Sequence, residues 1–206
     1  MDARHSPSCT AFAGVERFAS GDPREVALAC KRLVDGGDAR IVLVFDDATA
    51  EPVEFDLRGD AQEILQRLPS GASAVATDAG PAAPAPRTPG RPKLGVVGRE
   101  VTLLPRHWAW LNAQPGGASV ALRKLVEQAL RENKDSDRVR RSREVAFRFM
   151  SAMAGNEAGF EEAVRALFAG DRGRFEQYTM SWPPDVRGYA RSLATDSFSV
   201  AGGSVE

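Results

Sequence analysis

The stretch PGRPKLGVVGREVTLLPRHWAWL, residues 89–111, decides the fold of the central part of this chain. It opens with a Gly-Arg-Pro core, continues into alternating apolar residues and ends in a segment with two tryptophans. Alternation is typical of a strand, and Pro105 is a residue type favoured in the first turn of a helix. The stretch therefore predicts a strand, EVTLL at residues 100–104, followed by a helix.

A second helix follows after a short break. The Pro-Gly-Gly sequence at residues 115–117 ends the first helix, and ASVALRKLVEQALREN, residues 118–133, then shows helical periodicity. Its apolar face consists of Leu122, Leu125, Val126, Ala129 and Leu130. Residues 93–133 are therefore predicted to form a strand-helix-helix unit.

This order of strand, helix, glycine turn and helix resembles the ribbon–helix–helix DNA-binding fold. The matching residues are the strand VTLLP, Trp108 and Leu111 in the first helix, and the GGAS sequence that leads into the second helix. In that family the strands of two chains pair antiparallel, and the two-stranded ribbon lies in the major groove of DNA. The resemblance implies a homodimeric DNA-binding protein that acts as a transcriptional regulator.

The resemblance also implies which side chains contact DNA. It places Thr102 against base edges and Arg99 against a guanine or a phosphate, while Ser119 and the first-turn N–H groups of the second helix face a phosphate. The predicted DNA-binding residues are Arg91, Lys93, Arg99, Thr102, Arg106, Ser119 and Lys124. In an alternative arrangement, LGVV at residues 94–97 folds onto EVTLL as an intrachain hairpin and occupies the edge that a dimer requires.

A short match supports contact with DNA. The sequence TPGRPKLG, residues 88–95, resembles the AT-hook, in which an Arg-Pro segment lies along the minor groove of A·T-rich DNA. Arg91 and Lys93 fit that pattern, whereas Pro89 stands where the motif has an arginine before its glycine. A solvated linker is the other interpretation of this match.

The charge distribution points to an anionic partner for the middle of the chain. The net charge is −1, but residues 87–144 carry 13 basic and 6 acidic residues, a net charge of +7. Residues 1–70, with 8 basic and 13 acidic residues, have a net charge of −5. A basic segment between acidic flanks is typical of a region that binds polyanions.

The two neighbouring tryptophans indicate a second possible function. Trp108 and Trp110 flank Ala109, so we expect them on different faces of one helix, one in the core and one at a contact surface. They are the predicted partner-binding residues of a protein–protein interaction module that binds no nucleic acid.

Residues 8–68 are predicted to form a small ββαββα domain. TAFAGVERFASG reads as a hairpin that turns near Gly14, and PREVALACKRLV as a helix capped by Asp22. RIVLVF, residues 40–45, is an apolar run that predicts a strand buried on both faces, with VEFDL, residues 53–57, as its partner strand. DAQEILQRL closes the domain as a short helix.

The rest of the chain divides by composition. Residues 69–92 are rich in Pro, Ala, Gly and Ser and predict a disordered linker. Residues 134–195 show successive amphipathic helical patterns separated by glycines and by Pro183-Pro184, and residues 196–206 are expected to be a disordered tail. The predicted class is therefore α+β, with a mainly α-helical C-terminal region.

Several classes of function find no support in the sequence. No apolar run approaches the ~20 residues needed to cross a bilayer, and the N-terminus lacks the apolar core of a signal peptide, so we expect a cytoplasmic protein. Cys9 and Cys30 lack metal-binding spacing, and His107 has no identifiable nucleophile near it. Carboxylates cluster near Asp46 and Asp47, but their spacing fits no calcium loop. We therefore predict no metal, no cofactor and no enzymatic activity.

Long phrases of the chain resemble a known family as a whole. GRPKLGVVGREVTLLPRHWAWLNAQPGGAS, EEAVRALFAGD and WPPDVRGYA are similar to a family of uncharacterised bacterial proteins known as a domain of unknown function. The resemblance implies a cytosolic bacterial protein and brings no established activity, ligand or site residue.

Overall fold

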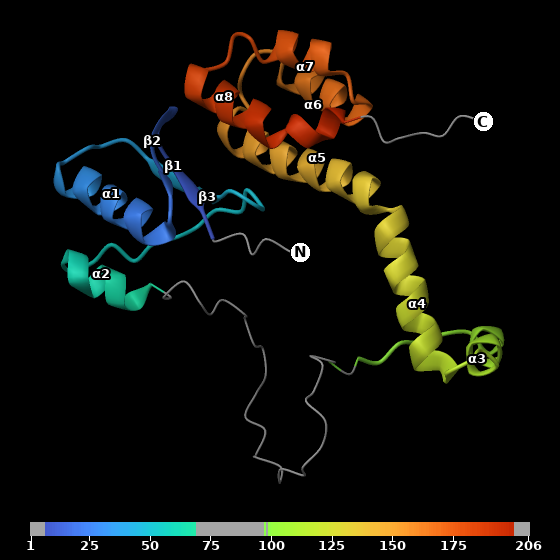
Figure 1. The fold of residues 1–206 in the computed structure, drawn as a ribbon. Coiled ribbons are helices and arrows are strands. Elements are labelled where there is room, and N and C mark those ends of the chain that lie inside the picture. Colours follow the sequence, from blue (N-terminus) through green and yellow to red (C-terminus); the bar gives the residue numbers. More distant parts are fainter. Residues whose placement is uncertain (1–6, 69–96, 98, 200–206) are drawn as a thin grey trace. The chain divides into compact units, whose positions relative to one another are not determined.

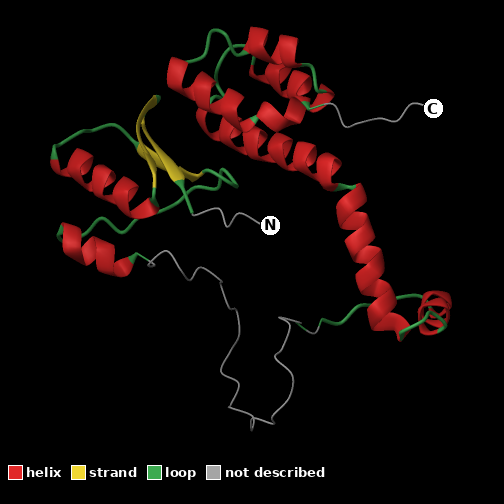
Figure 2. Cartoon of the chain, in the orientation of Figure 1, coloured by secondary structure: helices red, strands yellow, loops and turns green. Residues whose placement is uncertain are grey.

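The computed structural model of the chain describes residues 7–68, 97 and 99–199. Its class is α+β, as predicted (Figure 2). The strands are β1 (Cys9–Ala13), β2 (Glu16–Gly21) and β3 (Val42–Asp46). The helices are α1 (Pro23–Asp35), α2 (Ala61–Arg67), α3 (Pro105–Asn112), α4 (Gly117–Glu132), α5 (Lys134–Met153), α6 (Phe160–Ala169), α7 (Arg172–Tyr178), α8 (Pro184–Leu193) and the 3-10 helix η1 (Thr195–Phe198).

The chain forms two compact units. Unit 1 combines Met1–Ala74 with Lys134–Glu206, and unit 2 is Val75–Asn133. The predicted linker, residues 69–92, lies outside the described residues. Residues 8–68 and 134–195, which the sequence presents as separate regions, thus belong to the same unit. These two regions belong together because they share one hydrophobic core.

The sheet of unit 1 has β1 at its centre. The strand order is β2-β1-β3, and both pairings are antiparallel. The predicted hairpin is confirmed: it joins β1 to β2 through Gly14, whose φ of 59° is in the left-handed region that favours glycine. All five residues of β1 are buried, because neighbouring strands cover both edges and helices cover both faces.

Alternate residues of β1 face two different cores. Cys9 and Ala11 pack with Val26 and Cys30 of α1, whereas Phe12 packs among aromatic and aliphatic side chains of α5 and α8. Successive side chains of a strand point to opposite faces, so the period of two places one core on each side. Helix α1 therefore covers one face of the sheet and α5 with α8 the other (Figure 1).

Local signals fix the ends of α1 and α2. The Asp22 carboxylate accepts a hydrogen bond from the Arg24 amide at 2.8 Å, and Pro23 occupies the first turn of α1. Asp60 and Glu63 form a reciprocal capping box at the start of α2. The cap at Asp22 is the one predicted from the sequence, whereas the capping box of α2 is not predicted; in both, aspartate oxygens satisfy the free N–H groups of a first turn.

The fourth predicted strand, VEFDL, is absent from the described structure. Next to β3 the chain forms one isolated bridge, Phe45 with Pro52, and Val53 donates one bond to the Val44 carbonyl. Asp46 also donates to the Glu51 carbonyl at 3.0 Å, and among the described residues the pairing does not extend beyond these two bonds. The N-terminal part of β3 is consequently an edge: Ile41 and Leu43 are exposed, and the prediction of a strand buried on both faces is wrong for these residues.

Helices α5 to α8 supply most of the larger core. Phe149 and Met150 of α5 are fully buried, and Trp182, between α7 and α8, donates its indole N–H to the Ala158 carbonyl at 3.1 Å. Phe149 lies 5.5 Å from Phe12 and 5.2 Å from Phe45 between ring centroids. This aromatic cluster joins the sheet to α5.

The chain after α8 is ordered further than the sequence suggests. Residues 195–198, part of which belongs to the predicted tail, form η1, and Ser197 is buried. The Ser142 hydroxyl hydrogen-bonds the Leu193 carbonyl at 2.7 Å and the Ser197 hydroxyl at 2.8 Å. These side-chain contacts to α5 hold η1 in place.

Unit 2 contains α3 and α4. Pro105 begins α3, as predicted, and Gly116, with a φ of 88°, precedes α4. The predicted strand at residues 100–104 does not form within the single chain, because no other described segment pairs with it. The alternative intrachain hairpin requires residues 94–96, which lie outside the described residues.

Candidate functional site

The predicted DNA-binding residues that the structure describes all belong to unit 2. Arg99 and Thr102 precede α3 in a segment without helix or strand, and both are exposed. Arg106 is the second residue of α3, and it is also exposed. Arg91 and Lys93 lie outside the described residues.

Ser119 and Lys124 lie on α4. Ser119 is in the first turn, where Gly116 is the N-cap and no side chain caps the helix. The first amide, that of Gly117, bonds the Gln114 carbonyl at 2.9 Å. Ser119 is exposed at this terminus, and Lys124 is exposed one turn later. The start of α4 is therefore accessible to an anion, and the free N–H groups of a first turn favour the binding of anions.

Neither tryptophan of α3 is a core residue. Trp108 is 37% exposed and Trp110 is 52% exposed, whereas Leu111 is buried. The expectation that one tryptophan fills the core is therefore wrong within the single chain. Leu111 of α3 and Ala121 of α4 are the buried residues of this helix pair, so the contact between the two helices is small.

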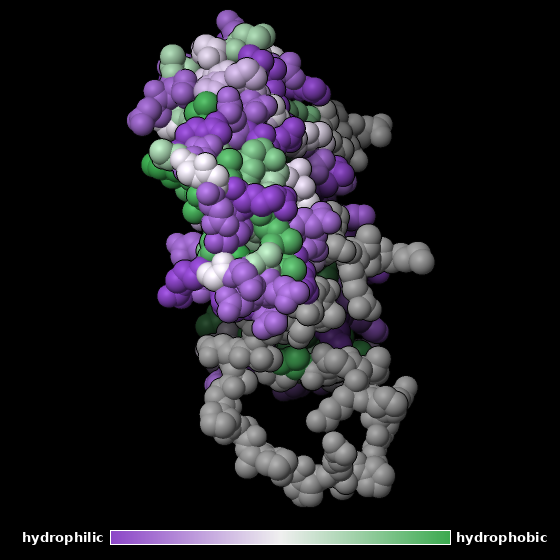
Figure 3. Space-filling model, turned by 90° about the vertical axis from the view of Figure 1, so that its left-hand side faces the viewer, coloured by the Kyte–Doolittle hydropathy of each residue, from purple (hydrophilic) through white to green (hydrophobic). Residues whose placement is uncertain are grey.

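The apolar face of α4 is uncovered over most of its length. Leu125 is 44% exposed, Val126 is 55% exposed and Leu130 is 59% exposed. Val101 and Leu104, ahead of α3, are exposed as well. On the face of the molecule in Figure 3, hydrophobic patches lie between hydrophilic side chains, and unit 1 also exposes large apolar residues, among them Ile41 and Met180. A monomeric protein rarely leaves one amphipathic helix face open in this way.

Unit 2 also differs from unit 1 in its charges. Every ion pair between described residues lies in unit 1. The cations of unit 2 without an acidic partner among the described residues are Arg99, Arg106, Arg123, Lys124 and Arg131. Unneutralised cations on a small helical unit are available to an external anion.

Unit 1 contains a hydrogen-bond network that the sequence does not reveal. The Tyr189 hydroxyl donates to Asp47 Oδ1 at 2.6 Å, and the Thr10 hydroxyl donates to the same atom at 2.7 Å. Burial and the neighbouring Asp47 carboxylate raise the pKa of Tyr189 above its usual range. The tyrosine is therefore a donor in this network, and it links α8 to the end of β3.

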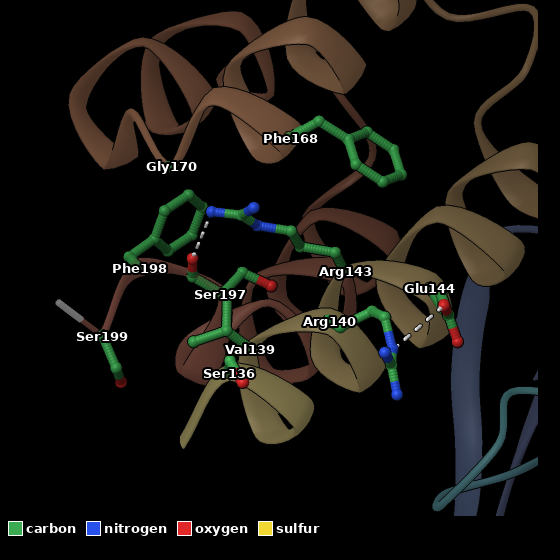
Figure 4. A pocket seen from close by; sticks show the side chains of 10 residues that line it. All are labelled: Ser136, Val139, Arg140, Arg143, Glu144, Phe168, Gly170, Ser197, Phe198 and Ser199. Atoms are coloured by element: carbon green, nitrogen blue, oxygen red, sulfur yellow. Dashed lines mark hydrogen bonds and ion pairs between the residues drawn. The ribbon is translucent and has the colours of Figure 1, made fainter. Parts of the chain in front are cut away.

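A second feature of unit 1 is a cavity of about 510 Å³ between α5, the C-terminal end of α6 and η1 (Figure 4). Arg140 and Arg143 of α5 contribute its cationic side, and Phe168 and Phe198 contribute aromatic rings. The sequence places these arginines in a charged helical stretch, but it gives no signal that α6 and η1 close a cavity around them.

The carboxylates near β3 are engaged within the chain. Asp46 accepts bonds from the Ala48 and Thr49 amides at 2.9 Å each, and Asp56 pairs with Arg58 at 2.8 Å. Hydrogen bonds from Arg58 hold the pKa of Asp56 well below its usual range. Within the described ranges no cluster of His, Cys, Asp and Glu side chains has the geometry of a metal site, and none of the helices there has the length and apolar character of a membrane span.

Comparison with known proteins identifies a family. The family model described as "Uncharacterized protein conserved in bacteria (DUF2239)" matches residues 8–194. No curated protein and no solved structure matches the chain. The match covers unit 2 and nearly all of the described part of unit 1, including α5 and α6 beside the cavity, and it ends just before η1. The chain therefore belongs to this family of uncharacterised conserved bacterial proteins.

Proposed function

We propose that the chain is a homodimeric DNA-binding protein that acts in transcriptional regulation, and that unit 2 forms both the dimer interface and the DNA contact. The observation that carries the proposal is the uncovered apolar face of α4, with Leu125, Val126 and Leu130 all exposed. In a ribbon–helix–helix protein, such apolar helix residues lie inside the dimer, where the helices of two chains pack together.

The size of the exposed apolar surface suits a second copy of the chain. Together with Val101, Leu104, Trp108 and Trp110, the three α4 residues expose roughly 600 Å² of side chain, given large apolar side chains of ~150–250 Å² each. A stable interface removes about 800 Å² from each partner, so those of these residues that share one face would supply part of one side.

The segment before α3 favours a partner that is identical in sequence. No backbone group from Glu100 to Leu103 forms a hydrogen bond with another described residue. Unpaired, exposed backbone is a template for strand pairing, and two copies of one segment pair antiparallel across a two-fold axis. A homodimer would thereby form the strand that the single chain lacks.

The free cations supply the contact with DNA. In a dimer Arg99, Arg106, Arg123, Lys124 and Arg131 would be present twice, without acidic partners among the described residues. Each phosphate that such a cation neutralises releases a counterion, and the affinity then falls with salt. Thr102 would lie on the ribbon, where base edges are read.

The test is fluorescence anisotropy of the full chain with a mixed-sequence duplex at about 50 and about 200 mM salt. We expect an affinity loss of about 10³-fold or more between these conditions, since six or more phosphate contacts have that effect. Arg106→Ala and Lys124→Ala should each weaken binding and reduce the salt dependence. Arg172→Ala, in unit 1 and paired with Glu176 at 2.7 Å, is the matched control and should bind normally. No binding at low salt by a chain shown to be dimeric would refute the DNA contact.

A second candidate function rests on the exposure of the two tryptophans. Trp108 and Trp110 have the size and accessibility of interface anchors, which favours a protein-interaction module that binds no nucleic acid. The anisotropy titration at two salt concentrations separates the two functions, because the affinity of an apolar helix interface changes little with salt.

A further inference from the structure

We infer that the cavity between α5, α6 and η1 binds a small organic phosphate whose phosphate group lies against Arg143 and Arg140 and whose planar ring lies against Phe168 and Phe198. The inference concerns unit 1 and does not depend on DNA binding by unit 2. It rests on three features: the unused hydrogen-bond donors of Arg143, the presence of Arg140 as a second arginine, and the aromatic wall of Phe168 and Phe198.

Arg143 has more donors than the chain uses. A guanidinium carries five N–H groups. Its Nη2 donates to the Ser197 carbonyl at 3.3 Å, a long bond (Figure 4). Its Nε is buried and has no hydrogen-bond partner among the described residues. No described carboxylate forms an ion pair with Arg143, so no described residue neutralises the charge of this partly buried group.

The position of this guanidinium depends on Gly170, the residue that ends α6. A Cβ at Gly170 would lie 3.0 Å from Arg143 Nη2, and the φ of 73° also favours glycine there. The side chain thus reaches across from α5 into space that a larger residue would fill, and it lies between Gly170 and Ser197 (Figure 4).

Arg140 provides a second cation one helical turn before Arg143. It pairs with Asp137 at 2.9 Å and with Glu144 at 3.9 Å, and it is mostly exposed. Exposed pairs of this kind contribute little to stability, so the guanidinium is free to exchange a carboxylate for a phosphate. The two guanidinium groups point apart in the structure, that of Arg143 toward Gly170 and Phe198 and that of Arg140 on the side of Glu144 (Figure 4). Arg140 would therefore turn away from its carboxylates for both forks to hold the oxygens of one dianion.

The remaining wall is apolar and aromatic. Phe168 is exposed at the cavity, and its ring contacts Phe147 edge-on at 5.9 Å between centroids. Phe198 stacks at a tilt against Phe175 at 5.3 Å, which holds its ring in place. The volume, about 510 Å³, is within the range of small-molecule sites. A nucleoside monophosphate combines the planar ring and the phosphate that these walls favour.

The test is isothermal titration of the full chain with adenosine 5′-monophosphate, with adenosine and inorganic phosphate as the separate halves of the ligand. We expect 1:1 binding of the monophosphate, weaker binding of inorganic phosphate, and the weakest binding of adenosine. Arg140→Ala should weaken binding about tenfold or more, and Arg143→Lys, which keeps the charge but removes the fork, should do the same. Arg165→Ala, an exposed arginine on α6 outside the cavity, should leave the affinity unchanged.

Three results would overturn the inference. They are the absence of binding at millimolar monophosphate, equal affinity for adenosine and its monophosphate, and full affinity in Arg140→Ala with the fold verified by circular dichroism. Because Arg140 is exposed, its substitution leaves the fold intact. It therefore decides the question even if Arg143→Lys destabilises the chain.

Discussion

Asp47 is the residue through which positions far apart in the sequence meet. One of its oxygens accepts hydrogen bonds from Thr10 and from Tyr189, which is 142 positions away. Such long-range contacts cannot be predicted from the sequence, in which Asp-Asp after a strand indicates only a turn. The capping aspartates, Asp22 and Asp60, can be found because their partners are two or three residues away.

The Tyr189 hydroxyl stabilises unit 1 through its hydrogen bond to Asp47. Tyr189→Phe should lower the free energy of unfolding by about 1 kcal/mol, since it removes one hydrogen bond to a charged acceptor that Thr10 still partly satisfies. Urea denaturation measures the change. Tyr178→Phe is the control, because the Tyr178 hydroxyl bonds no described residue. An equal loss in both variants would contradict the role of the network.

The two buried thiols predict a pH dependence. Burial raises the pKa of Cys9 from 9.0 to about 12 and the pKa of Cys30 from 9.0 to about 11. The folded chain therefore keeps protons that the unfolded chain loses. This contribution to stability is complete below pH 9.0 and declines as the pH rises toward 11 and 12. Urea denaturation at about pH 8 and about pH 10 should show the decline, and Cys30→Ala should make it smaller. A decline of the same size in Cys30→Ala would contradict this assignment.

At the scale of helices and strands, the sequence predicts what local chemistry determines. The starts of α1, α2 and α3 follow from Asp22, Asp60 and Pro105, and the glycines at 116 and 117 separate α3 from α4. The strand predicted at residues 53–57 fails because its existence depends on a partner, and its pairing with β3 stops at the isolated Phe45–Pro52 bridge. Strand patterns describe a side-chain period, whereas a strand also requires an adjacent backbone.

A pair of glycine substitutions tests the turn before α4. Gly116→Ala places a Cβ 3.1 Å from the Val120 side chain at a φ of 88° and should destabilise the α3–α4 pair by about 1 kcal/mol or more. Gly188→Ala, inside α8 and with no atom within 4 Å of the new Cβ, should stabilise unit 1 by about 0.5–1 kcal/mol. Amide hydrogen exchange reports each helix separately. Unchanged exchange across α4 in Gly116→Ala would show that the turn tolerates alanine.

At the scale of the whole molecule, the main finding that the sequence does not predict is the shared core of residues 8–68 and 134–195. The sequence shows two apolar-patterned regions separated by a Pro/Ala-rich stretch and a basic strand-helix-helix segment. It does not show that Phe12 and Phe45 pack on Phe149. Periodicity identifies which faces are apolar, but it does not identify which two faces meet. The cavity beside α5 is unpredictable for the same reason.

The shared core predicts that the sheet and the C-terminal helices unfold together. Phe12→Ala in β1 should lower the free energy of unfolding of unit 1 by about 3–5 kcal/mol, because the buried ring contacts Phe45, Phe149 and Tyr189. Trp182 fluorescence, measured with Trp108 and Trp110 replaced by phenylalanine, reports the C-terminal helices. A Trp182 transition that does not move in Phe12→Ala would mean that the two regions unfold separately.

Sedimentation equilibrium of the full chain shows whether a second copy of the chain covers the apolar face of α4. We expect the mass of two chains for the native protein and of one folded chain for Leu125→Asp/Leu130→Asp. Both leucines are exposed in the single chain, so these changes should not unfold it. Ile41→Asp, at the most exposed large apolar residue in the described part of unit 1, should remain dimeric. A native protein with the mass of one chain at all concentrations tested, or a leucine variant that stays dimeric, would contradict the account.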